Sequence, residues 1–117
     1  MDMIENTTMN MPVLALRGLT IFPGCVISFD VERDISIRAL ERAMEQDQFI
    51  FLVAQRELGE IQPGERDLYS VGTVSVIRQI LRIGDSAVRV MMEGRSRAKL
   101  RRLWQTEPYL QGNVEPL

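Results

Sequence analysis

The 117-residue sequence has no histidine, one cysteine and one lysine, and each shortage excludes a class of chemistry. Without histidine, neither a Ser-His-Asp nor a Cys-His catalytic group can form. The only lysine, Lys99, follows alanine and therefore does not complete the Gly-Lys-Ser/Thr of a phosphate-binding loop. Cys25 can form no internal disulfide, and a single thiol with carboxylates is a poor zinc site. We therefore expect a chain that is not an enzyme and that holds no metal or cofactor.

Long hydrophobic runs and a basic amino-terminal segment are also missing. No stretch approaches the roughly 18 apolar residues of a membrane span. Asp2 and Glu5 stand where a secretory signal would carry basic residues. The expected location is the cytoplasm, without membrane contact. Residues 1–11 show no periodicity and are expected to form a flexible tail, which leaves one domain over residues 12–117.

Charge of both signs is present, but it is unevenly distributed along a chain whose net charge is −2. Residues 30–67 contain five basic and ten acidic side chains, a local net charge of −5. Residues 76–104 contain eight basic and two acidic side chains, a local net charge of +6. This asymmetry either steers charged partners or lets the two halves face each other in the folded domain.

Hydrophobic periodicity predicts an α+β protein that is mainly β, with short strands and one main helix inserted early. The helix is expected over residues 34–47, with Asp34 as its N-cap. Ile37, Leu40 and Met44, with Ala43, form an apolar stripe that is expected to pack on the core. The pattern suggests a small, partly open β-barrel with a helical plug. The expected strands cover residues 11–16, 26–31, 49–54, 70–83, 87–92, 95–104 and 109–114.

Breaks in the alternating pattern predict bends and turns in the second half of the chain. The apolar positions change parity near Ile77–Gln79, which predicts a bulge or bend there. Residues 84–86 (Gly-Asp-Ser) are expected to form a hairpin turn, and Gly94 is expected to mark another turn. The polar segment 55–67 reads either as a solvated connector or as a functional loop.

The stretch LRGLTIFPG, residues 16–24, is unusually apolar for the start of a turn. Pro23 and Gly24 supply turn geometry, and large apolar side chains precede them. Two interpretations stay open: a buried corner between two strands, or an exposed surface that binds another molecule. The exposure of Leu19 and Ile21 is expected to decide between them, with Phe22 helping to fix the corner.

A basic row in the segment RSRAKLRRLW is the second ambiguous feature. Alternation would place four basic side chains on one face of a strand: Arg95, Arg97, Lys99 and Arg101. Such a row could meet nucleic-acid phosphates. No aromatic residues interleave with it to stack bases, and the acidic half of the chain could neutralise it. A solvated strand face is therefore the favoured interpretation.

Three segments give the sequence a family resemblance: PVLALRGLTIFPG (12–24), DLYSVGT (67–73) and EGRSR (93–97). In this order and spacing they resemble the N-terminal domain of Lon protease. The resemblance runs from about Pro12 to Leu117 and implies a PUA-like small pseudo-barrel of about six strands. That lobe would end before the helical part of the N-domain, the ATPase and the Ser-Lys protease. ATP and magnesium would belong to the ATPase domain, not to this chain.

The resemblance implies a lobe that recognises unfolded, damaged or degron-bearing proteins for a homo-hexameric AAA+ ring. Unfolded clients expose apolar segments, so their binding surface should itself be apolar. The candidate apolar residues are Leu19, Ile21, Phe22, Tyr69 and Met91. The helix start offers a second, charged surface at Arg33, Asp34 and Arg38. The alternatives are a standalone binding module of the same fold and a PUA-like nucleic-acid-binding domain.

Overall fold

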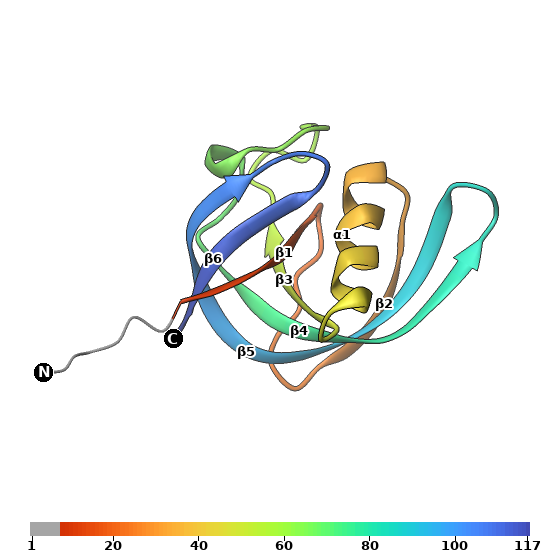
Figure 1. Cartoon of the computed structure of the whole chain (residues 1–117), viewed down its shortest axis with the longest axis horizontal. Helices are drawn as coiled ribbons and strands as arrows, with labels where there is room; N and C mark the ends of the chain where they lie inside the picture. The colour runs from red at the N-terminus through yellow and green to blue at the C-terminus, as the bar shows by residue number, and fades with distance from the viewer. Residues whose placement is uncertain (1–7) are drawn as a thin grey trace, which may run out of the picture.

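Six strands and one α-helix make up the fold of the computed structural model, which describes residues 8–117 (Figure 1). This confirms the expected mainly β class with a single main helix. A short 3-10 helix, Glu65–Asp67, interrupts the long loop after the third strand. The elements in chain order are β1 (Met9–Leu16), β2 (Val26–Val31), α1 (Asp34–Glu45), β3 (Phe49–Ala54), β4 (Val71–Ile83), β5 (Ala87–Gln105) and β6 (Leu110–Pro116).

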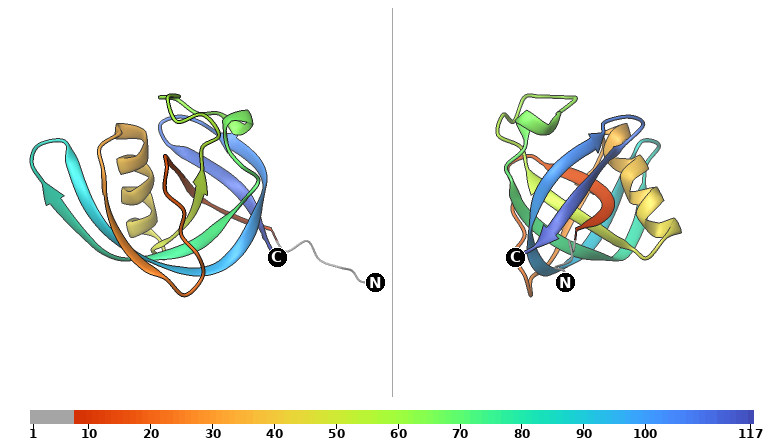
Figure 2. Two further views of the ribbon diagram at one scale, coloured as in Figure 1. Left: turned by 180° about the vertical axis from the view of Figure 1, so that it is seen from behind. Right: turned by 60° about the vertical axis from the view of Figure 1, so that its left-hand side comes forward.

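Five of the strands form a closed barrel. The order β5-β4-β3-β1-β6 returns to its start because β6 also pairs with β5. The remaining strand, β2, pairs antiparallel with the first part of β5, outside the barrel. Figure 2 shows how β2 and the β4–β5 hairpin extend from the barrel as a curved arm. The expected partly open barrel is therefore a closed one with an added arm.

The parallel pair β1–β3 is buried on both faces, which explains its continuous apolar sequence. Val13 and Phe51 point into the barrel, where they join side chains from all the other barrel strands. Leu14 and Leu52 point to the outer face, where they meet α1 and the arm. Alternate side chains of these two strands therefore contribute to two separate cores, one inside the barrel and one on its outer face.

Strand β5 is 19 residues long and connects the barrel to the arm. Its first part pairs with β2 and β4, and its last part pairs with β4 and β6. The β4–β5 register shifts between Ile77 and Gln79, as the sequence predicts, and again between Val74 and Ser75. These irregularities bend the two strands away from the barrel wall.

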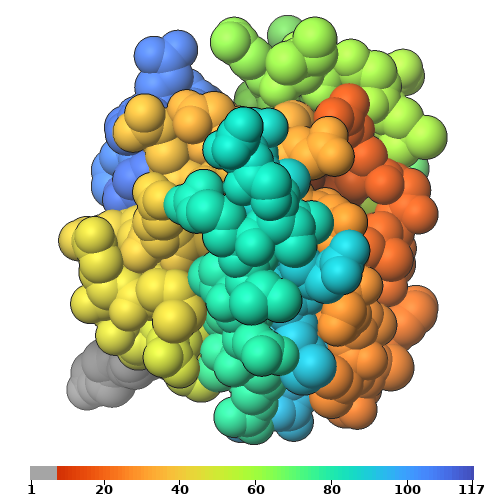
Figure 3. All heavy atoms as spheres, turned by 90° about the vertical axis from the view of Figure 1, so that its right-hand side faces the viewer, coloured from red at the N-terminus to blue at the C-terminus, as the bar shows by residue number. Residues whose placement is uncertain are grey.

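Helix α1 lies between the barrel and the arm, and Figure 3 shows the β4–β5 hairpin lying between α1 and β2. Its buried side chains are Ser36, Ala39, Leu40 and Ala43. Met44 is 40% exposed, so the predicted stripe is correct at Leu40 and Ala43 but wrong at Met44. The expected N-cap is also wrong. Arg33 is the cap residue, and the Asp34 carboxylate instead accepts a hydrogen bond from Arg38 at 2.8 Å.

The amino-terminal boundary of the domain lies earlier than the sequence predicts. Residues 1–7 of the expected tail lie outside the described residues. Met9 and Asn10 belong to β1, where they pair with Val114 and Asn113 of β6. Met11 is buried in the barrel core. Asn10 and the polar residues before Met9 conceal the start of the strand in the sequence, because only residues 11–16 are continuously apolar.

Gly94 does not form the predicted turn, because β5 continues through it as a strand. A Cβ at this position would lie 2.3 Å from the carbonyl oxygen of Phe22. Gly94 also exchanges two backbone hydrogen bonds with the corner, one with Gly24 and one with Cys25, each of 2.9 Å. Glycine is needed here for close approach of two backbones, not for reversal of the chain.

We expect Gly94→Ala to lower the free energy of unfolding by about 1–3 kcal/mol, because the added methyl must displace the Phe22 carbonyl. Gly59→Ala is the matched control, since a Cβ there meets nothing within 4 Å. Denaturant unfolding of both variants measures the difference. Equal stability of the two variants would contradict the close approach.

Surface ion pairs join β2 and β4 to β5. Asp30 of β2 accepts a hydrogen bond of 2.8 Å from Arg89 of β5, directly across the ladder. This bond lowers the pKa of the Asp30 carboxyl below its ordinary value of 3.8. Arg78 of β4 binds Glu93 of β5 and lowers the pKa of that carboxyl in the same way.

A lowered pKa in the folded state means that acid weakens the fold, because the unfolded chain binds the proton more readily. The Asp30 contribution is complete above about pH 5 and is lost as pH falls through the lowered pKa. Asp30→Asn should therefore flatten the loss of stability between about pH 5 and pH 3. Thermal unfolding at several pH values measures this. An unchanged slope, or an equal flattening by Asp85→Asn in the hairpin turn, would contradict the assignment.

Candidate functional site

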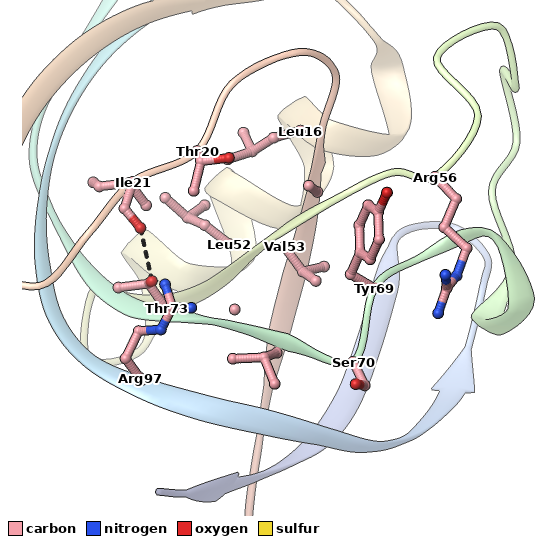
Figure 4. A pocket seen from close by; sticks show the side chains of 13 residues that line it. Leu16, Thr20, Ile21, Leu52, Val53, Arg56, Tyr69, Ser70, Thr73 and Arg97 are labelled. Carbon is pink, nitrogen blue, oxygen red and sulfur yellow. Dashed lines mark hydrogen bonds between the residues drawn. The ribbon is translucent and has the colours of Figure 1, made fainter.

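A groove of about 340 Å³ lies where β3 and β4 stop pairing (Figure 4). The β3–β4 ladder ends at the pair Leu52–Thr73. The chain pairs again only at an isolated bridge between Gln55 and Leu68. The segment between Leu68 and Thr73 is longer than the segment it faces, so the two backbones separate there. The groove is the space that this unequal spacing leaves.

The floor of the groove is apolar and buried, whereas its rim is exposed. Gly72 lies at the bottom, where a Cβ would sit 2.3 Å from the backbone oxygen of Leu52. Buried residues form the floor: Leu16, Ile21, Leu52, Val53 and Thr73. Tyr69 and Val71 stand on the rim with 47% and 38% of their surfaces exposed. An apolar floor with accessible apolar edges is suited to binding apolar side chains.

Each of two arginines at this groove covers an aromatic ring. The guanidinium carbon of Arg56 lies 4.7 Å from the centre of the Tyr69 ring. The guanidinium carbon of Arg97 lies 5.7 Å from the centre of the Phe22 ring, which is itself 55% exposed. Such a cation–π contact attracts the guanidinium to the ring and does not use up its N–H groups, which stay able to donate hydrogen bonds. The rim therefore combines aromatic surface with positive charge.

The opening corner, residues 17–25, holds Phe22 in this exposed position. Ile21 is only 2% exposed and belongs to the outer core, the apolar cluster between the barrel, α1 and the arm. Its carbonyl oxygen accepts a 2.8 Å hydrogen bond from the buried hydroxyl of Thr73. Together with the bonds to Gly94, these contacts fix the corner on both sides of Phe22. The corner is thus a rigid support that presents an aromatic side chain.

The apolar candidates from the sequence have different fates. Tyr69 lines the groove, and Phe22 stands beside it against Arg97. The prediction that Ile21 lies on the surface is wrong. Its side chain is buried in the core below the corner. Leu19 is half-buried against the same core. Met91 is half-buried on β5 and does not line the groove.

The charged candidates at the helix start border a second groove, of about 700 Å³, together with Ile61. Arg38 and Asp34 form an exposed ion pair. Arg33 is half-buried and donates hydrogen bonds of 2.7 Å to the Gln55 side chain and to the Ala15 carbonyl. Burial lowers the pKa of the Arg33 guanidinium. Arg33 therefore stabilises the fold, and of the three candidates only the ion-paired Asp34 and Arg38 remain as exposed charged surface.

The basic row on β5 is interrupted by bulges and partly neutralised. Arg95 lies at a register shift and pairs with Glu93, while Arg101 lies at another and pairs with Glu115. Lys99 is exposed. Arg97 turns toward the Phe22 ring. The four side chains thus do not form one continuous positive face, which agrees with the favoured interpretation.

Sequence reasoning did not find Arg56 and Val71. Both reach the groove because the β3–β4 ladder opens, and no local pattern records where a ladder opens. Val71 follows directly after Tyr69 and Ser70, so the DLYSVGT segment already marked its neighbourhood. Arg56 lies in the polar loop among other charged residues, and nothing in the sequence distinguishes it from them as a groove residue.

The described residues offer no metal centre as an alternative functional site. Across residues 8–117, no three side chains of the metal-ligating types gather closely enough to hold an ion. Within that same range, no helix has the length and apolar character needed to cross a membrane.

Comparisons with known proteins connect this fold to one family. The chain is 47% identical to the Lon protease of Clostridium acetobutylicum over 104 residues, which cover 89% of this chain and 13% of that protein. It is 42% identical to the Lon protease of Haemophilus influenzae over 115 residues, covering 98% of this chain and 14% of that protein. The chain therefore spans about one seventh of the length of these relatives.

Solved structures agree at the level of the fold. The N terminal domain of Mycobacterium avium complex Lon protease superimposes with a TM-score of 0.69 at 20% identity, covering 93% of this chain and 54% of that one. The Lon N-terminal domain protein from Xanthomonas campestris gives 0.69 at 15% identity, covering 92% and 59%. The model of the ATP-dependent protease La (LON) substrate-binding domain matches residues 10–117. The chain therefore belongs to the LON substrate-binding domain family.

Proposed function

We propose that this chain is the lobe of a Lon-type protease that captures unfolded, damaged or degron-bearing proteins and presents them to an AAA+ ring. The lobe itself is non-catalytic in this proposal, and the ATPase and protease activities belong to other parts of the longer protein. The single observation that carries the proposal is the groove beside the opening corner, with its apolar floor and exposed aromatic rim.

The physical argument begins with what an unfolded client offers. Folded proteins bury most of their large apolar side chains, so exposed apolar segments mark a chain that has lost its structure. The rim residues Tyr69 and Val71, together with Phe22 beside the groove, give such segments an accessible surface. Because the corner and β4 are fixed by core contacts, the surface is ready before a client arrives.

Weak binding at one groove is sufficient if several copies act together. Six lobes in a homo-hexamer would raise the effective concentration of grooves around a single extended client. The exposed, free thiol of Cys25 suits a reducing compartment, and we place the protein in the cytoplasm. The ion pairs within the basic row count against nucleic acid as the main ligand.

The variant Phe22→Ser/Val71→Ser should weaken capture of an unfolded protein by about tenfold, because two apolar contacts are lost on binding. Both side chains are exposed, so the free energy of unfolding should change by less than about 0.5 kcal/mol. Fluorescence anisotropy with labelled, reduced and carboxymethylated α-lactalbumin measures capture, and thermal unfolding measures stability.

Two comparison variants make this result specific. Leu81→Ser removes an exposed apolar side chain from the hairpin of the arm and should leave capture unchanged. Ile21→Ser should instead reduce stability by about 3 kcal/mol, because it places a hydroxyl in the outer core. Undiminished capture by Phe22→Ser/Val71→Ser, or equal loss with Leu81→Ser, would contradict the proposal.

A further inference from the structure

We propose that the groove selects extended peptide segments in which acidic residues flank an apolar one. This inference rests on the proposed function, and it names the class of segment that the groove prefers. It follows from the two arginines of the groove, from the apolar floor between them, and from the fact that no carboxylate of residues 8–117 pairs with either arginine.

The two positive groups stand apart, with the apolar floor between them. Figure 4 shows Arg97 and Arg56 on opposite sides of the floor residues Leu52 and Val53. Each guanidinium lies over an aromatic ring, and Arg56 Nε also donates a 3.2 Å hydrogen bond to the Leu68 carbonyl. A guanidinium held in this way presents N–H groups in a plane, which is the geometry that a carboxylate accepts best.

No carboxylate of the described residues neutralises either arginine. The lining of the groove includes Arg56 and Arg97 but no aspartate or glutamate. Three of the four acidic side chains of the neighbouring loop accept backbone N–H groups, and Glu60 accepts that of Gln62 at 3.1 Å. Asp67 accepts the Gly64 N–H at 2.8 Å, and Glu65 accepts the Leu103 N–H at 2.8 Å. Both arginines are thus available to carboxylates from outside.

Most other arginines on the sheet surface already have partners. Arg78, Arg89 and Arg101 each form an ion pair with a carboxylate of a neighbouring strand. The protein as a whole has a net charge of −2. An acidic segment is therefore attracted to the groove more than to the rest of the surface.

The apolar floor explains why the preferred segment needs an apolar residue as well as acidic ones. Its volume of about 340 Å³ lies at the lower end of the range for ligand sites and fits only a few side chains. The buried residues beneath it are aliphatic at Leu16, Leu52 and Val53. An apolar side chain fills this space, and acidic neighbours on either side reach the two arginines. A lysine in the same place would be repelled.

A single-stranded nucleic acid is the competing acidic ligand, and the groove suits it less well. One face of each aromatic ring is already covered by a guanidinium, which leaves less surface for base stacking. The floor is mainly aliphatic, and its one hydroxyl, that of Thr73, already donates to the Ile21 carbonyl, so it offers a base little hydrogen bonding. The observations therefore favour a peptide.

Three fluorescein-labelled peptides of equal length test the inference by anisotropy with the 117-residue chain. Each contains leucine and valine at alternate positions, and the intervening residues are all glutamate, all glutamine or all lysine. We expect the glutamate peptide to bind at least about fivefold more tightly than the glutamine peptide, and the lysine peptide to bind weakest. Equal affinity of the three peptides would overturn the inference.

Variants assign the preference to the groove. Arg56→Gln and Arg97→Gln should each reduce affinity for the glutamate peptide by about two- to fivefold, with little effect on the glutamine peptide. Arg82→Gln, on the distant hairpin, removes the same charge and should change nothing. Equal losses with Arg82→Gln would show a general charge effect and overturn the inference.

Two further binding measurements distinguish a nucleic-acid ligand and a failure of the proposed function from a failure of the acidic selectivity alone. Tighter binding of labelled oligo-dT than of the glutamate peptide would overturn the inference in favour of nucleic acid. Carboxymethylated α-lactalbumin provides the independent check on the proposed function. If the chain captures it through Phe22 and Val71 but shows no preference among the peptides, only the acidic selectivity fails. If the chain captures neither, the proposed function fails as well.

Discussion

The parallel pairing of β1 with β3 is the interaction on which the rest of this structure depends. These two strands are buried on both faces, so they contribute to the barrel core and to the outer core together. Helix α1 and the arm pack on one face, while the barrel closes around the other. Because both cores share these strands, the corner that follows β1 and the loop that follows β3 start from fixed points. The groove lies between those two segments.

The site is therefore a product of the core rather than of a flexible loop. Ile21 anchors the corner from below, and Gly94 lets β5 approach it from the side. Phe22 is exposed because its neighbours are not free to turn. The β3–β4 ladder opens at one place only because the barrel holds both strands on either side of the opening. The groove is therefore open to solvent in the folded domain, and no strand has to unpair to expose it.

Much of this architecture could be predicted from the sequence. Alternation identified most strand positions and the bend at Ile77–Gln79, because a change of parity must place a residue outside the regular ladder. Glycine was less informative. Gly94 reads as a turn in sequence, but its role depends on the Phe22 carbonyl, which lies far away in the chain. Ile21, offered as a surface candidate, is buried, whereas Phe22 from the same candidate set is exposed. The sequence did not separate these two neighbours, since the corner has no regular period to indicate which side chain faces inward.

Strand β5 has a consequence for how the lobe responds as a whole. It runs without interruption from the arm, where it holds β2, to the barrel, where it holds β6. Along β5 no loop of the described residues interrupts the strand between the two cores, so the same backbone is hydrogen-bonded to both parts of the lobe. Tension applied to a segment held at the groove, which Arg97 of β5 lines, would therefore reach both cores through this one strand.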